Sequence, residues 1–150
     1  MPPNRLPPAP LRNSALTDRM GFDVWYMDAV QLKPGNGLKL WFESTNSPHR
    51  QGVFVATDGI LTVADGTSGA FQLWADTAPR PVVIRCVETS LGKLVLYNIY
   101  QAAGRSPMSQ ALTSGMLIEQ LAEGARRYRC CDVAAEPTFD RLVFSIRPIA

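Results

Sequence analysis

Two tryptophans, Trp41 and Trp74, are the side chains whose type and spacing most clearly indicate a binding function. Each lies in a short run in which apolar and polar residues alternate, so in an extended strand each indole points away from the apolar face. Large aromatic side chains on an outward face usually mark an interface or a ligand platform. We therefore predict a ligand or interface face formed by the two indoles and their same-face neighbours, which are Lys39, Glu43, Gln72 and Asp76.

This predicted face has three interpretations. In a self-associating protein, the indoles are anchors buried at the contact with a second copy or with another protein. In a carbohydrate-binding module, they stack on sugar rings while nearby polar side chains bind the hydroxyls. In a structural interpretation, the N-terminal segment, the loop 102–114 or a helix at 115–124 covers the face. We favour a non-catalytic interaction or assembly domain that self-associates through this face, with a carbohydrate- or small-ligand-binding module as the alternative.

Enzymatic activity is the third hypothesis, because residues able to do covalent or acid–base chemistry form no local motif. Cys130 or Cys131 could pair with His49 as a thiol and its base. Glu43 and Asp76 could form a carboxylate pair of the kind that hydrolyses glycosides. The sequence contains no serine elbow, glycine-rich phosphate loop or helical pair of metal ligands. We therefore assign no catalytic residue from the sequence.

The residues that could bind a metal are aspartates near the ends of predicted strands. Loops that converge at one end of a β-protein can hold Ca²⁺ through such carboxylates, but their spacing matches no calcium loop, and Asp-Gly pairs are also common in turns. The single histidine and three cysteines lack the spacing of a zinc site. We predict no metal site and no cofactor. The aspartates in question are Asp58, Asp65, Asp76, Asp132 and Asp140.

Length and charge narrow the class of protein. The chain of 150 residues suits one domain, and a net charge of +2 from scattered basic residues argues against a nucleic-acid partner. No apolar run approaches the ~20 residues that span a bilayer, which predicts no membrane association. The N-terminus has proline and arginine where a signal peptide has an apolar run, and the cysteines suggest no disulfide framework, so we expect a cytoplasmic protein.

The segments that would position the predicted face are short β-strands separated by turn signals. The central stretch 52–76 reads as three strands, broken at Asp58-Gly59 and again at residues 65–69. Residues 22–32 and 38–43 flank a strong turn at 34–37 and are predicted to form a hairpin. Leu38, Leu40 and Phe42 would face the core.

Together these signals predict an all-β fold, an antiparallel β-sandwich or jelly roll of about eight strands. Residues 1–19 contain five of the twelve prolines and are predicted to be a flexible tail, with a single domain at 20–150. At most one short helix is expected, near 115–124, although a hairpin is preferred there. In layout, with aspartates in the loop before the last strand, the chain is similar to small carbohydrate-binding modules.

Overall fold

The computed structural model describes residues 6–134 and 136–150 and shows an all-β protein with one short α-helix. The helix is α1 (Ser14–Met20), and a 3₁₀ turn, η1 (Ala122–Gly124), lies between the eighth and ninth strands. The strands are β1 (Leu11–Arg12), β2 (Trp25–Gln31), β3 (Gly37–Thr45), β4 (Arg50–Val63), β5 (Gly66–Trp74), β6 (Val82–Glu88), β7 (Lys93–Gln101), β8 (Gly115–Gln120), β9 (Arg126–Cys131) and β10 (Leu142–Ile149).

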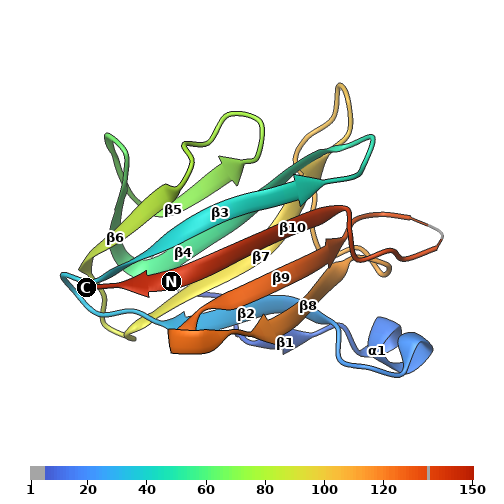
Figure 1. The fold of residues 1–150 in the computed structure, drawn as a ribbon, viewed down its shortest axis with the longest axis horizontal. Helices are drawn as coiled ribbons and strands as arrows, with labels where there is room; N and C mark the ends of the chain where they lie inside the picture. Colours follow the sequence, from blue (N-terminus) through green and yellow to red (C-terminus); the bar gives the residue numbers. More distant parts are fainter. Residues whose placement is uncertain (1–5, 135) are drawn as a thin grey trace.

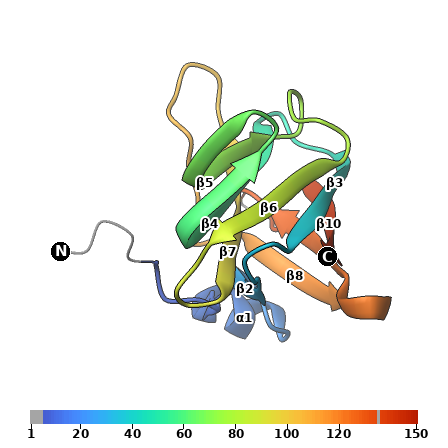
Figure 2. The same ribbon diagram turned by 90° about the vertical axis from the view of Figure 1, so that its left-hand side faces the viewer.

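Eight of these strands form a closed antiparallel barrel in the order β2-β7-β4-β6-β3-β10-β9-β8 (Figures 1 and 2). The barrel closes where β8 pairs with β2 through Trp25 and Met116. β1 pairs outside it with β2, and β5 pairs with β4. The prediction of an all-β fold is confirmed, but the sandwich or jelly roll is wrong. A β-sandwich and a β-barrel have the same alternation and turn spacing, so these signals do not distinguish them. The pairing that closes this barrel joins residues far apart in sequence, and local patterns do not reveal it.

The barrel interior is filled by apolar side chains from every barrel strand. Leu38, Leu40 and Phe42 face this core, as their alternation predicts. Tyr128 stacks on Phe144 with ring centroids 4.6 Å apart, and both side chains are fully buried. The interior is therefore a packed core that holds the strands in place.

The turn at residues 34–37 lies between two strands that do not pair, so the predicted hairpin of 22–32 with 38–43 is wrong. β2 and β3 do not pair with each other; β2 pairs with β7 and β3 pairs with β6. The turn itself is tied to β6, because Gly35 donates to the carbonyl of Cys86 and Cys86 donates to that of Asn36. The position of the turn was predicted correctly, but the strands on its two sides pair with other strands and not with each other.

Asp58-Gly59 also fails to form the predicted turn, and residues 50–63 run as one long strand, β4, with a pairing irregularity between Ala56 and Leu61. A Cβ on Gly59 would lie 2.0 Å from the carbonyl oxygen of Glu88, so glycine is required for the close approach of β6. The second turn signal marks a real hairpin of β4 with β5, but the chain reverses at residues 64–65, and residues 66–69, predicted as part of the turn, already belong to β5.

The helix lies in a different segment from the one considered in the sequence. Residues 115–124 form β8 and η1, which confirms the preferred hairpin with β9. The α-helix occupies 14–20, so all but its last residue lies in the segment predicted to be a tail. Asn13 caps it by accepting from the backbone N–H of Leu16, and both side chains are buried. The described part of the segment therefore contributes to the domain from residue 11 onward, and residues 1–5 lie outside the described range.

Candidate functional site

The outer surface of β3, β10 and β9 contains three of the six predicted site residues, Lys39, Trp41 and Glu43. Trp41 is half-buried and pairs with Ser145 of β10. The guanidinium carbon of Arg147 lies 5.4 Å from the Trp41 ring centroid. An open groove of about 520 Å³ follows this surface, which we call the Trp41 groove. Its lining residues are Trp41, Phe42, Glu43, Leu121, Ala125, Arg127, Ser145, Ile146 and Arg147.

Trp74 lies on β5 and is only 9% exposed. Arg50 lies over its indole, with the guanidinium carbon 4.4 Å from the ring centroid. The same guanidinium binds Asp76 through Nε at 2.9 and 3.0 Å. Gly52 makes room beneath the ring, because a Cβ there would lie 2.8 Å from Cε3 of Trp74. The indole is thus held between a glycine and an arginine instead of being an exposed platform.

The six predicted residues therefore divide between two places. Gln72 is exposed on β5, beside Trp74. β3 and β5 belong to the same sheet but do not pair with each other, so the two indoles do not lie on neighbouring strands. Glu43 and Asp76 come together at one end of the barrel, where both line an open pocket of about 200 Å³. The other residues of this barrel-end pocket are Phe42, Ser44, Thr45, His49, Gln51, Ala75 and Arg80.

The two carboxylates of the barrel-end pocket are each bound by an arginine. Nε of Arg127 donates to Glu43 at 2.9 Å, and Arg50 binds Asp76 as described. A glycosidase pairs one carboxylic acid with one carboxylate, and the acid must be kept protonated by its surroundings. Both carboxylates already accept hydrogen bonds from arginines, which hold them as fixed acceptors, so this geometry suits the binding of a polar ligand better than acid–base catalysis.

Gln51 is the buried polar residue at the base of the barrel-end pocket and is 3% exposed. Its Nε2 donates to Asp132 at 2.9 Å and to the carbonyl of His49 at 3.2 Å. Both partners can only accept here, so they fix the orientation of the amide. Its Oε1 is left without a hydrogen-bond partner among the described residues. A buried acceptor without a donor is costly, and a bound donor group would satisfy it.

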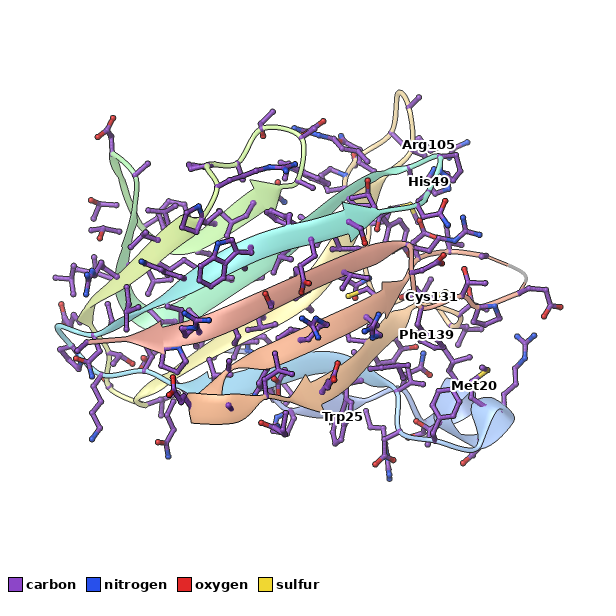
Figure 3. The ribbon with its side chains drawn as sticks, in the orientation of Figure 1. Met20, Trp25, His49, Arg105, Cys131 and Phe139 are labelled. Carbon is purple, nitrogen blue, oxygen red and sulfur yellow. The ribbon has the colours of Figure 1, made fainter. Side chains whose placement is uncertain are left out.

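The cysteines do not complete a catalytic pair with His49. Cys130 and Cys131 are fully buried, and burial raises the pKa of both thiols, which disfavours the nucleophilic thiolate. His49 lines the barrel-end pocket and neither cysteine does. Figure 3 places His49 near Arg105, in the loops at this end of the barrel, and Cys131 apart from them, toward β9.

Sequence reasoning missed a buried polar cluster inside the barrel, on β2 and β9. The hydroxyl of Tyr128 donates to Asp28 at 2.5 Å, and Arg126 binds the same carboxylate oxygen at 2.7 Å. Burial, followed by the charge of Asp28, raises the pKa of Tyr128 well above its usual value, so the phenol remains a donor. The alternation of Arg126 with Tyr128 was visible in the sequence, but nothing there indicated that Asp28 lies opposite them.

The described residues contain no group of three or more His, Cys, Asp or Glu side chains that could hold a metal ion. Among the same residues, no helix has the length and apolar character needed to cross a membrane. Comparison with protein families, curated proteins and solved structures finds no match for this chain.

Proposed function

We propose that this protein is a non-catalytic interaction domain that self-associates through the open edge of β5. The observation behind the proposal is that one edge of β5 has no strand paired with it in the described structure. β5 lies beside β4 at the outside of the barrel (Figure 2), and within residues 6–134 and 136–150 it pairs with no other strand. An unpaired edge presents a row of backbone N–H and C=O groups that can pair with another strand.

The sequence of β5, GTSGAFQLW, lacks the features that protect such an edge. Soluble proteins guard exposed edge strands with lysine, other charges or proline, and this nine-residue strand contains none of them. It also includes Gln72 and Trp74 from the predicted interface face. A long, uncharged edge is expected in a protein that pairs there with a partner.

A second copy is the simplest partner for this edge. Two identical strands pair antiparallel about a two-fold axis, so a residue on one side of the axis contacts the residue equally far on the other side in the second copy, and the reverse contact is also made. Full-length pairing of β5 places the axis near Ala70, its central residue. The alternative for the assembly, stacking through the outward tryptophans, has less support because Arg50 covers Trp74.

Light scattering on the purified protein tests this proposal. We expect a dimer, and we expect the double variant Ala70→Lys, Gln72→Lys to be monomeric, because the axis would bring the four new charges close together. Val87→Lys is the matched control: Val87 is 53% exposed on β6, outside the proposed contact, and its variant should remain dimeric. A monomeric wild-type protein would refute self-association, and a dimer that survives the double variant would exclude the β5 edge. Circular dichroism checks that each variant is folded.

We also propose a second candidate function, the binding of a small hydroxyl-rich molecule such as a monosaccharide in the barrel-end pocket. Two carboxylates held by arginines offer acceptors for hydroxyl groups, and their charges are balanced by their partners. The unpartnered Oε1 of Gln51 is a further acceptor next to this pocket.

Titration with single monosaccharides, followed by NMR of the backbone amides, tests this second function. We expect shifts confined to the residues around the barrel-end pocket, and their loss in Asp76→Ala. Asp65→Ala, which removes a carboxylate from the exposed turn between β4 and β5, should leave the shifts unchanged. If no sugar causes localised shifts, this second function is wrong.

A further inference from the structure

We propose that the Trp41 groove binds an acidic segment of a second protein, at a surface separate from the β5 edge. The first observation is the position of Lys39 and Arg147, which stand directly opposite each other on β3 and β10. Like charges in directly opposed positions destabilise a pair of strands. The residues the structure describes place no carboxylate within ion-pair distance of either side chain.

Arg127, on the same surface, differs from Lys39 and Arg147 because acidic side chains lie next to it. Arg127 binds Glu43 at 2.9 Å and lies 3.6 Å from Glu119. Across the outward positions of β3, β8, β9 and β10, four basic residues face two acidic ones, which leaves a net charge of +2. An anionic group beside Lys39 and Arg147 would remove the repulsion between them. The basic residues are Lys39, Arg127, Arg129 and Arg147, and the acidic ones are Glu43 and Glu119.

The groove also has an apolar part, which a simple anion would not use. The half-buried indole of Trp41 lies on one side, and Leu121 and Ala125, which flank the η1 turn, line the other. Aromatic side chains with adjacent arginines are enriched where proteins bind each other. An apolar side chain can therefore lie between Trp41 and Leu121, while flanking carboxylates reach Arg147, which lies over the indole, and Lys39 opposite it on β3.

These features favour a protein segment over a nucleic acid. Proteins that bind nucleic acids commonly contact on the order of 6–10 phosphates, whereas the described residues offer two cations without an acidic partner here, Arg147 in the groove and Lys39 opposite it on β3. Glu43 also lines the groove and would repel a phosphate backbone. The groove offers one indole and, on the strand beside it, a cation. These side chains suit a short acidic segment that contains one apolar residue.

The Trp41 groove and the β5 edge can be tested separately because they share no residue. β5 pairs only with β4 among the described strands, whereas the groove lies on β3, β9 and β10. Loss of the dimer in the β5 double variant should leave binding in the groove intact. Conversely, groove variants should leave the solution mass unchanged.

The test measures fluorescence anisotropy of a fluorescein-labelled peptide of glutamates around a central leucine, titrated with the full-length protein. We expect saturable binding that weakens as salt is added, and at least a tenfold loss of affinity in Lys39→Gln, Arg147→Gln, since charge-assisted contacts are removed. The matched control is Lys33→Gln, Arg105→Gln, which removes the same charge from exposed loops and should change affinity less than twofold.

Other outcomes would overturn the proposal. Equal losses in the two double variants would mean attraction to net charge alone, without a groove. Tighter binding of an oligothymidylate than of the peptide would mean a nucleic-acid surface. No binding of the peptide at low salt would exclude the site. Melting temperatures of both double variants establish that the proteins are folded, and Trp41→Leu provides a second variant, which should also lose affinity because the indole face is removed.

Discussion

Tyr128 donates its hydroxyl hydrogen to a carboxylate inside the barrel, so its contribution to stability differs from that of an ordinary core aromatic residue. Asp28 is 5% exposed and depends on Tyr128 and Arg126 for its hydrogen bonds. We predict that Tyr128→Phe lowers the free energy of unfolding by about 1–3 kcal/mol, because the buried carboxylate loses one of its donors while the packing of the ring is kept. Urea denaturation monitored by circular dichroism measures this change.

Tyr97 provides the control for that measurement. Its ring stacks on Phe54 with centroids 4.8 Å apart, and its hydroxyl makes no hydrogen bond within the described part of the chain. Tyr97→Phe should therefore change the free energy of unfolding by less than about 0.5 kcal/mol. Equal effects of the two substitutions would mean that the Asp28 carboxylate does not depend on the phenol.

At Gly52, close neighbours leave no room for a side chain. A Cβ at this position would lie 2.6 Å from the carbonyl oxygen of Leu73 and 2.8 Å from the Trp74 ring. We predict that Gly52→Ala destabilises the protein by about 1–3 kcal/mol, in the range of other overpacking substitutions, and displaces the indole from beneath Arg50. Acrylamide quenching of tryptophan fluorescence should increase; unchanged quenching would show that β5 accommodates the methyl group by moving as a unit.

Asp58 connects two elements, the irregular part of β4 and the turn between β6 and β7. Its carboxylate accepts from the Thr89 hydroxyl at 2.7 Å and from the backbone N–H groups of Ser90 and Leu91. Burial alone would raise its pKa, but these hydrogen bonds lower the pKa of Asp58 below its ordinary value of 3.8. We predict that Asp58→Ala destabilises the protein by about 1–2 kcal/mol at pH 7, because three donors lose their acceptor.

The pH dependence of this effect follows from the lowered pKa. A carboxylate whose pKa is lower in the folded state stabilises the protein at pH values above its unfolded pKa, and this stabilisation is lost as the pH falls through the folded value. The difference between wild type and Asp58→Ala should therefore be constant near neutral pH and shrink below pH 3.8. Urea denaturation of both proteins, at neutral pH and below pH 3.8, measures this difference in the free energy of unfolding. A difference that persists fully in acid would mean that Asp58 acts through packing, and Asp65→Ala controls for the loss of an exposed aspartate.

At the scale of elements, the sequence predicted strands better than it predicted their partners. Alternation assigned Leu38, Leu40 and Phe42 to the core because side-chain direction in a strand depends only on position. The turns at 34–37 and 58–59 were misread because glycine serves both tight reversals and close approaches between strands. Helix α1 was missed because nearby prolines dominated the composition, although Asn13 and Gly21 carry the ordinary signals of a helix start and end.

The candidate site was predictable to a similar depth. The alternation of β3 placed Trp41 opposite Leu40 and Phe42, but the burial of Trp74 beneath an arginine of another strand has no local signature. The meeting of Glu43 and Asp76 in one pocket, the orientation of Gln51 and the opposition of Lys39 to Arg147 all depend on long-range pairing. Such pairings are set by the fold as a whole, and local periodicity does not specify them.

For the whole molecule, the closed barrel makes the location of an open edge informative. β5 is a nine-residue strand that pairs only with β4 in the described structure, so its other edge is open along its whole length. If β5 joins two copies, unfolding is coupled to dissociation, and the melting temperature must depend on protein concentration. We predict that the melting temperature of the wild type rises when the concentration is raised a hundredfold, while that of Ala70→Lys, Gln72→Lys stays constant. Differential scanning calorimetry at two concentrations measures this, with Val87→Lys expected to follow the wild type. If the melting temperatures of all three proteins are independent of concentration across the range in which the dimer would dissociate, β5 does not join two copies.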